Sequence, residues 1–262
     1  MDPDIGALSL ERAEVLSMES LPRHIHRSSG SQSDSTKDEV IPPFRQAHAR
    51  FMNESYSQVV DSGAVGFVKK YVHRMLERGH SKSVNTILEL GAGQGQHLNF
   101  VQQPFLRYIQ SDWIIRKELS ELPRVENKKL NAEDLTEIES GSVDRVIATC
   151  LLTHLDNPEK ALHEWRRVVA AGGWLSLWVP CEMGMLLRTA QSLTTKRKIE
   201  KNGFDYEWMC RLDHRNHFPM MRALIKQVFS KDHVHFSGVP FTKLPWDLQL
   251  LRVYQIQKRP NP

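Results

Sequence analysis

Short apolar runs separated by polar turns recur from residue 86 onward and predict strands. The clearest run, Thr86–Leu90, is interrupted only by Glu89 and stops at Gly91. A short apolar run bounded by glycine is typical of a buried strand that ends in a tight turn. Similar runs predict strands at residues 108–112, 142–148, 174–179, 233–236 and 248–257.

Apolar positions at helical spacing predict helices before, between and after these strands. The first helix lies within residues 51–79, where Val65, Val68, Val72, Met75 and Leu76 fall on one face. Glycine at position 79 is a plausible end for it. Further helices are predicted at residues 158–170 and 220–229.

Two segments lack this patterning. Residues 1–42 contain a polar, serine-rich stretch, which predicts a disordered tail, with a short helix at residues 8–18 as the alternative. Residues 181–218 are polar, cationic and irregular, and we expect them to form a mobile cover that selects the substrate. Residues 181–262 hold 14 Lys plus Arg against 7 Asp plus Glu, which favours an anionic substrate, although a solvated basic face is also compatible.

Composition excludes several classes of protein. The 35 basic and 31 acidic residues are nearly balanced, so no strong field indicates nucleic acid. Three cysteines, without a recurrent spacing, predict neither a disulfide framework nor a zinc site. We found no membrane-length apolar run and no secretory signal, and therefore expect a protein of the reducing cytoplasm without membrane insertion. The sequence does not predict the oligomeric state.

The turn after the first strand carries glycine at every second position, Gly91, Gly93 and Gly95. Glycine permits positive φ and a close approach of backbone to a ligand, and a helix beginning near Gly95 would direct free N–H groups toward that ligand. The spacing departs from the dinucleotide fingerprint, which disfavours a nicotinamide dehydrogenase. A carboxylate at Glu89 disfavours a pyrophosphate and favours a cationic amino-acid group.

At this point the sequence resembles a known family. Glu89-x-Gly91-x-Gly93-x-Gly95 resembles motif I of the class I S-adenosylmethionine (SAM)-dependent methyltransferases. Asp112 ends the second strand, where Rossmann-like folds bind ribose hydroxyls. Residues 130–135 resemble the family's adenine-side segment, with Asn131 where an acidic residue is usual. Residues 144–180 resemble the ubiquinone-biosynthesis-like (type 11) branch, and the whole resemblance covers residues 83–180.

The resemblance implies an α/β fold, with a Rossmann-like, doubly wound sheet of seven strands. The sheet is mostly parallel with an antiparallel C-terminal hairpin. N-terminal helices at 43–80 would cover the cofactor, and the SAM-binding domain would span residues 81–262. The implied cofactor is SAM, with S-adenosylhomocysteine as the product. The implied cofactor-binding residues are Tyr56, Glu89, Gly91, Ala92, Gly93, Gly95, Asp112, Asn131, Ala132 and Glu133. Packing of Tyr56 on the sheet edge is an equal alternative.

Methyl transfer by in-line displacement needs a base only when the nucleophile arrives protonated. Histidine has a pKa suited to that task, and His154 and His214 are the candidates. His154 follows the fourth strand at the ligand-binding edge of the sheet, although it could simply cap a turn. Arg215 and His217, in a segment that resembles substrate-side sequences of this branch, are the predicted acceptor-binding residues.

The acceptor can be narrowed but not identified. Cys150-Leu151-Leu152-Thr153 stands where amino-group methyltransferases carry an Asn/Asp-Pro-Pro-aromatic motif, and no paired acidic magnesium ligands are recognisable. We therefore predict a metal-free methyltransferase that acts on a small molecule, at oxygen. A carbon or nitrogen target, and a non-catalytic SAM-fold binding or regulatory module, are the alternatives.

Overall fold

The computed structural model describes residues 62–113 and 122–260. The expectations for the tail at 1–42, for helices within 43–61 and for Tyr56 lie outside these ranges. No helix of the described ranges is long and apolar enough to cross a membrane.

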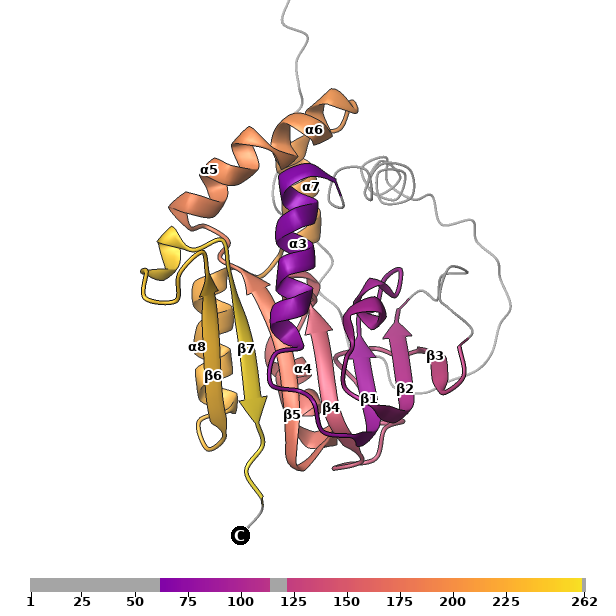
Figure 1. Cartoon of the computed structure of the whole chain (residues 1–262). Coiled ribbons are helices and arrows are strands. Elements are labelled where there is room, and N and C mark those ends of the chain that lie inside the picture. The colour runs from indigo at the N-terminus through magenta and orange to yellow at the C-terminus, as the bar shows by residue number, and fades with distance from the viewer. Residues whose placement is uncertain (1–61, 114–121, 261–262) are drawn as a thin grey trace, which may run out of the picture. The chain divides into compact units, whose positions relative to one another are not determined.

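Seven strands form one sheet, in the order β3-β2-β1-β4-β5-β7-β6 (Figure 1). Strands β1 to β5 pair in parallel, and β7 pairs antiparallel with both β5 and β6. The predicted doubly wound sheet with an antiparallel C-terminal hairpin is therefore confirmed. The strands are β1 (Val84–Leu90), β2 (Phe105–Asp112), β3 (Val125–Lys129), β4 (Val143–Thr149), β5 (Val169–Pro180), β6 (His233–Val239) and β7 (Leu251–Gln257).

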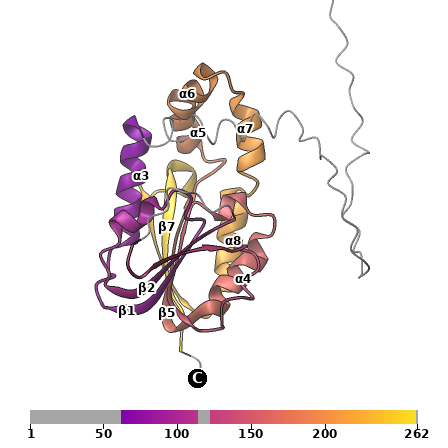
Figure 2. The same ribbon diagram turned by 90° about the vertical axis from the view of Figure 1, so that its right-hand side faces the viewer.

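Helices cover both faces of this sheet (Figure 2). On one face lie α4 (Pro158–Val168) and α8 (Phe218–Val228), and on the other lies α3 (Gly63–Leu76). Short 3₁₀ helices occupy three connections, η1 (Gln96–Phe100), η2 (Leu152–His154) and η3 (Trp246–Leu248). The helix expected near Gly95 is thus only the five-residue η1.

Side chains along each strand point alternately to the two faces of the sheet, so the hydrophobic core is divided between these faces. Leu88 and Leu90 pack with Trp165 of α4 and Phe218 of α8 in the larger cluster. On the opposite face, Ile87 packs with neighbouring strands and with residues that flank η1. Strand side chains point alternately to opposite faces, so one strand supplies both clusters. The main strands and helices were accordingly visible as apolar runs and helical periods in the sequence.

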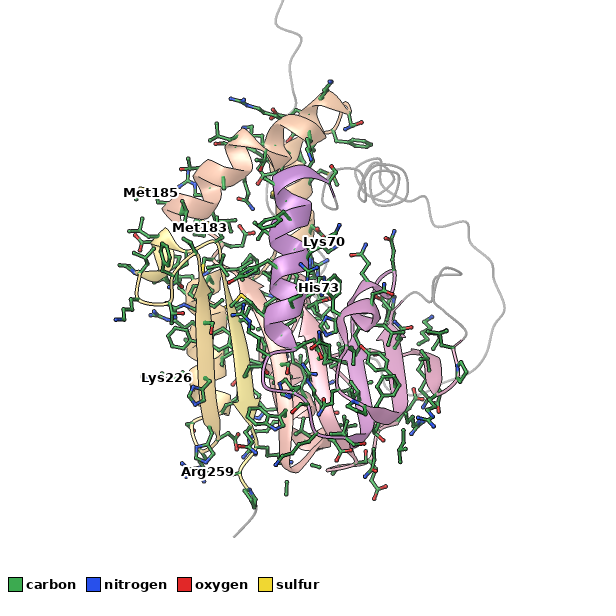
Figure 3. All side chains as sticks on the ribbon, in the orientation of Figure 1. Lys70, His73, Met183, Met185, Lys226 and Arg259 are labelled. Atoms are coloured by element: carbon green, nitrogen blue, oxygen red, sulfur yellow. The ribbon has the colours of Figure 1, made fainter. Side chains whose placement is uncertain are left out.

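The segment predicted to be irregular is largely helical instead. Residues 181–218 contain α5 (Met185–Leu193), α6 (Thr195–Lys201) and α7 (Tyr206–Asp213). They lie beyond the carboxyl ends of the parallel strands (Figure 1). No residue of α5 is buried, and Met183 and Met185 are 66% and 60% exposed (Figure 3). The apolar side chains Leu186, Leu187 and Ala190 of α5 are half-buried and lie within a polar, cationic segment, which is why the sequence did not mark a helix here.

A buried ion pair fastens α3 to the sheet and to η1. Arg145 of β4 is fully buried and donates from Nη2 to Glu77 Oε1 at 2.9 Å and to the Leu76 carbonyl at 2.7 Å. His97 of η1 lies 3.0 Å from the same carboxylate through Nε2. Glu77 follows α3, so this network fixes the connection that leads out of the glycine turn.

Candidate functional site

The glycine loop, residues 91–95, lies at the carboxyl end of β1, next to β4. Strand order reverses between these two strands, and open α/β sheets bind ligands at such a switch point. Gly91, Gly93 and Gly95 have φ of 65°, 57° and 72°. These values lie in the left-handed region that glycine adopts without strain, so the predicted turn chemistry is present.

Asp112 holds this loop from the neighbouring strand. Its Oδ2 accepts a hydrogen bond of 2.8 Å from the Gly93 backbone N–H, and the Ala92 N–H donates to the Ser111 carbonyl at 2.9 Å. A Cβ built on Gly93 would meet no atom of residues 62–113 or 122–260 within 4 Å. The loop is therefore braced from below while its outer side is open to a ligand, which fits the close backbone approach that SAM requires.

Glu89 lies beneath the loop and not at its surface. The residue is 1% exposed, and its Oε2 accepts a hydrogen bond of 2.9 Å from the Tyr108 hydroxyl. Burial raises the pKa of this carboxyl, against the opposing effects of His97 and Tyr108. In the described structure Glu89 therefore ties β1 to β2 directly below the turn, a position from which it can shape the loop.

The three residues predicted at the adenine side already make contacts of their own. Asn131 Oδ1 accepts from the Glu133 N–H at 3.0 Å, and the Ala132 carbonyl accepts from Trp165 Nε1 at 2.9 Å. Glu133 Oε1 accepts from the backbone N–H groups of residues 156 and 157, at 2.6 and 3.1 Å. Glu133 thus anchors the approach to α4, and Asn131, which is exposed, is the better placed of the three to meet a ligand.

The loop after β4 presents Cys150 and His154 beside the glycine loop. A Cβ on Gly91 would lie 2.8 Å from the Leu151 side chain, so the two loops are in direct contact. Cys150 has φ of 58°, which is uncommon for a residue other than glycine. Thr153 Oγ1 donates to the Cys150 carbonyl at 2.9 Å and helps to hold this turn.

Asn216 clamps the loop after β4 to the segment between α7 and α8. The side chain is buried, and its Nδ2 donates to the carbonyls of Leu152 and Leu155 at 2.9 and 2.7 Å. Backbone N–H groups of Arg215 and Asn216 also donate to the Thr153 carbonyl. Sequence reasoning missed this residue, whose only signal was its place beside His214.

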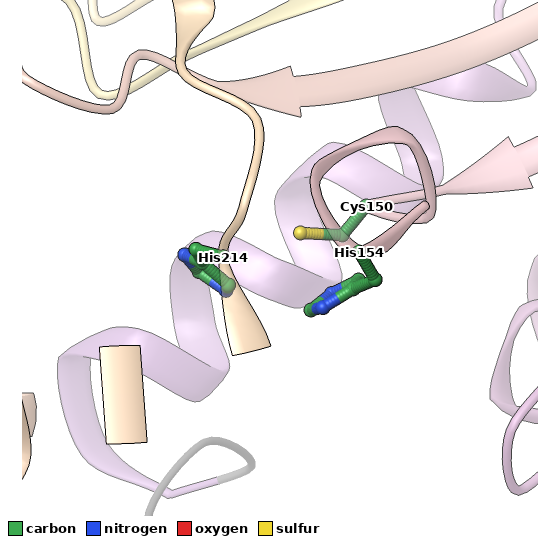
Figure 4. A group of neighbouring side chains, drawn as sticks. All are labelled: Cys150, His154 and His214. Carbon is green, nitrogen blue, oxygen red and sulfur yellow. The ribbon is translucent and has the colours of Figure 1, made fainter. Parts of the chain in front are cut away.

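This clamp brings the two predicted catalytic histidines together. The rings of His154 and His214 have centroids 5.1 Å apart and meet edge to face. His154 Nδ1 lies 2.7 Å from the Asp213 carbonyl and 3.1 Å from Asp213 Oδ1. His214 Nδ1 lies 2.7 Å from Glu182 Oε1. Each imidazole is therefore oriented through Nδ1 by an oxygen acceptor (Figure 4 shows the rings with Cys150).

The surroundings of His154 favour its charged form. Burial opposes the charge, but hydrogen bonds to Asp213 and Cys150, together with their negative charges, raise the pKa of His154 well above its usual value. The side chain keeps 32% of its surface exposed. His154 is therefore suited to face an anionic group.

The two predicted acceptor-binding residues have different positions. Arg215 is exposed and forms an ion pair with Asp156 across the same two segments. His217 caps α8, and its Nδ1 accepts from the Met220 N–H at 3.4 Å. His233 and His235 lie in the predicted strand at residues 233–236 and are exposed on β6 at the sheet edge. Arg215 thus stays beside the histidines, while His217 has a structural role in the described chain.

Comparison with known proteins agrees with this fold. Residues 88–177 match the family model described as "Methyltransferase domain". A curated human (Homo sapiens) relative, thiol S-methyltransferase TMT1B, is 31% identical over 101 residues, which are 35% of this chain and 41% of the relative. The chain therefore spans less than half the length of that relative.

Solved structures share the architecture. A SAM-dependent methyltransferase from Archaeoglobus fulgidus superposes with a TM-score of 0.52 at 13% identity, over 75% of this chain and 95% of that chain. The DszA carbon methyltransferase gives a TM-score of 0.55 at 15% identity, over 82% and 61% of the two chains.

Residues 88–177 therefore match a methyltransferase domain, and the fold is shared with solved SAM-dependent methyltransferases. The implied methyl donor is SAM. Membership of the ubiquinone-biosynthesis-like branch stays a prediction.

Proposed function

We propose that this chain transfers a methyl group from SAM to a small-molecule acceptor, at an oxygen atom. The observation that carries the proposal is the pair of carboxylate-supported histidines, one of which lies on the loop that approaches Gly91 through Leu151. A hydroxyl acceptor arrives protonated, so it needs a base, whereas the methyl group of SAM is already activated. The contact between Gly91 and Leu151 supports a site at which the methyl donor and the base lie near the same switch point.

On the cofactor side, the chain's contribution is to hold SAM in place. The open outer side of Gly93 admits the ligand against the backbone. Asp112, at the end of β2, is the candidate for the ribose hydroxyls, and Asn131 is the candidate for the adenine edge. Tyr56 remains a candidate cover over the methionine end.

On the acceptor side, His214 is the better candidate for the base. Glu182 Oε1 lies 2.7 Å from its Nδ1 and holds the orientation of the ring. A catalytic base is commonly oriented by a third group in this way. In the metal-free chain, His154 is held in its charged form by Asp213 and Cys150 and would stabilise the anion that forms as the hydroxyl loses its proton. Holding oxygen and methyl in line can supply about 7–11 kcal/mol of the barrier.

We further propose that residues 181–218 form the cover over the acceptor. Helices α5 to α7 lie beyond the carboxyl ends of the strands, and the segment supplies both Glu182 and His214. The exposed apolar side chains of Met183 and Met185 are compatible with a surface that closes over a ligand. The basic surplus of this half of the chain, with Arg215 beside the histidines, favours an anionic acceptor.

The experiment is a screen of hydroxyl-containing metabolite pools with methyl-labelled SAM. The purified full chain should release S-adenosylhomocysteine and give a labelled ether or ester, and His214→Ala should give much less. If the labelled methyl group is found on nitrogen or carbon, the proposed oxygen acceptor is wrong. SAM binding without any labelled product across the pools would instead favour the non-catalytic alternative.

A further inference from the structure

Three metal-ligand side chains converge beside the glycine loop. Within the described ranges, Cys150 Sγ and one ring nitrogen each of His154 and His214 lie within 4.8 Å of one another. Figure 4 shows Cys150 and His154 extending from the loop after β4 toward His214, which comes from the end of α7. All three are partly exposed, so an ion could reach them.

We propose that Cys150, His154 and His214 form a zinc site. One thiolate and two imidazoles are a donor set that zinc accepts readily. Zinc–nitrogen and zinc–sulfur bonds of about 2.0–2.3 Å place tetrahedral ligand atoms roughly 3.4–3.6 Å apart. The ligand atoms, which lie within 4.8 Å of one another, are thus at most about 1.4 Å further apart than in a closed site. Rotations of the three side chains are enough to close it.

The groups around the two histidines match the second layer of a metal site. Metal-binding histidines usually direct their other ring nitrogen to a carboxylate or a backbone carbonyl. Here the Nδ1 atoms face the Asp213 carbonyl at 2.7 Å and Glu182 Oε1 at 2.7 Å. This arrangement leaves Nε2 of each ring as the nitrogen that faces the ion, with His214 Nε2 a long 3.9 Å from Asp213 Oδ2.

The backbone also holds the ligands in place before any ion binds. Asn216 bonds to both ends of η2, which fixes His214 relative to the loop that carries Cys150 and His154. Thr153 Oγ1 bonds to the Cys150 carbonyl and supports its strained φ. A preformed geometry of this kind lowers the ordering cost of binding.

Three protein ligands leave a fourth position open, as in catalytic zinc sites. Because Leu151 touches Gly91, that position would lie near the glycine loop. The role that follows rests on the proposed function. A hydroxyl acceptor in the fourth position would release its proton to solvent on coordination, and zinc would then take over the roles of both histidines, whose rings would bind the ion unprotonated. Zinc binding itself does not depend on methyl transfer.

The first test uses the chelator-treated full chain and cobalt(II), a coloured substitute for zinc, without SAM or acceptor. We expect one ion per chain, with a thiolate-to-cobalt charge-transfer band and the visible bands of tetrahedral cobalt. Cys150→Ser should lose the charge-transfer band, and the matched control Cys210→Ser should keep it. Glu182→Gln should weaken zinc binding by about 10–100-fold. Equal cobalt spectra for the two cysteine variants would overturn the site.

The second test needs no variant, so a folding defect cannot obscure it. Equimolar zinc should slow alkylation of Cys150 in the wild-type chain, measured by peptide mass spectrometry, and should leave the rate at Cys210 unchanged. Unchanged alkylation of Cys150 would contradict the proposal. SAM binding is then measured by calorimetry on the same metal-free and zinc-loaded samples. This measurement separates the zinc proposal from the proposed methyltransferase function, because SAM should bind even if zinc does not.

Discussion

The glycine loop and the histidine cluster (Cys150, His154 and His214) adjoin each other but are built in different ways. Asp112, which braces the loop, lies on the strand next to β1, and the bracing bond goes to backbone. The histidine cluster draws on two segments, and its histidines are 60 positions apart. Buried side chains, above all Asn216, hold those segments together. The first site is therefore largely local in sequence, and the second is a product of tertiary packing.

This difference has a consequence for how each site responds to mutation. Changes at the glycine loop should act on the cofactor through backbone space and one carboxylate. Changes at the histidine cluster should act on turnover while the cofactor remains bound. The four predictions below separate the two sites, in order of decreasing expected effect.

The largest effect is expected from Gly93→Val, which should abolish SAM binding measured by calorimetry. The added side chain would occupy the open space where the ligand approaches the backbone. The matched control is Gly141→Val, because Gly141 also has positive φ, 71°, and open space around its Cβ position. Both variants should lose roughly 1–2 kcal/mol of stability through left-handed strain. Normal SAM affinity in Gly93→Val would mean that the loop is only a structural turn.

For the histidine cluster, His214→Ala should lower kcat by about 10²–10⁴-fold, the usual cost of losing a general acid–base group. SAM affinity should stay within a few-fold of wild type because the ring lies on the acceptor side. The control is His163→Ala, on the exposed face of α4. An unchanged kcat for His214→Ala would remove this residue from the chemistry.

The third prediction is for Glu77→Gln, which removes the carboxylate that pairs with the buried Arg145 and with His97 of η1, the helix after the glycine loop. Burial alone would raise the pKa of Glu77, but the hydrogen bond from His97 and the charge of Arg145 lower the pKa to about 2. The stabilisation from the Glu77–Arg145 pair is therefore complete above pH 4.5, the ordinary pKa of a glutamate, and is lost as the pH falls toward 2. Leaving Arg145 buried and unpaired should cost about 3–5 kcal/mol at pH 7.

Denaturant unfolding at pH 7 and pH 3 measures this effect. The deficit of Glu77→Gln relative to wild type should narrow at pH 3. The control is Glu126→Gln, which breaks an exposed pair with Arg107 and should cost about 0–1 kcal/mol. Equal costs for the two variants at pH 7 would contradict the structural role of the buried pair.

The smallest predicted effect is at Asp112. A hydrogen bond to a charged group is worth about 1.5–3 kcal/mol, so Asp112→Ala should weaken SAM by roughly 10- to 150-fold. Asp112→Asn retains an acceptor for the Gly93 N–H and should lose less. Identical SAM affinity in wild type and Asp112→Ala would withdraw the ribose assignment.

The same contrast explains what could be read from the sequence. Strands such as β1 and β4 are buried apolar runs, and glycine at alternate positions marked the turn. Strand β3 was not predicted because Val125–Lys129 has no fully buried residue and reads as polar. Helix α5 was not predicted because its apolar side chains are only half-buried and stand within a polar, cationic segment that reads as irregular.

The candidate site was readable only in part. His154 and His214 were identified singly, from position and resemblance, but nothing in the sequence indicates that they meet. The two histidines come together because Asn216 bonds to the carbonyls of Leu152 and Leu155, at the two ends of η2. Every residue has a backbone carbonyl, so these bonds cannot be predicted from the sequence. The proposed zinc site was hidden from the sequence for the same reason. Cys150 and His154 are close in sequence, but the third ligand joins them only in the folded chain.

The most direct test of the account is a calorimetric titration of the full chain with SAM, repeated with NADH. We predict saturable binding of SAM at one site per chain and no heat from NADH. Binding of NADH, or no binding of SAM by the folded chain, would contradict the assignment of the glycine loop to a methyl donor.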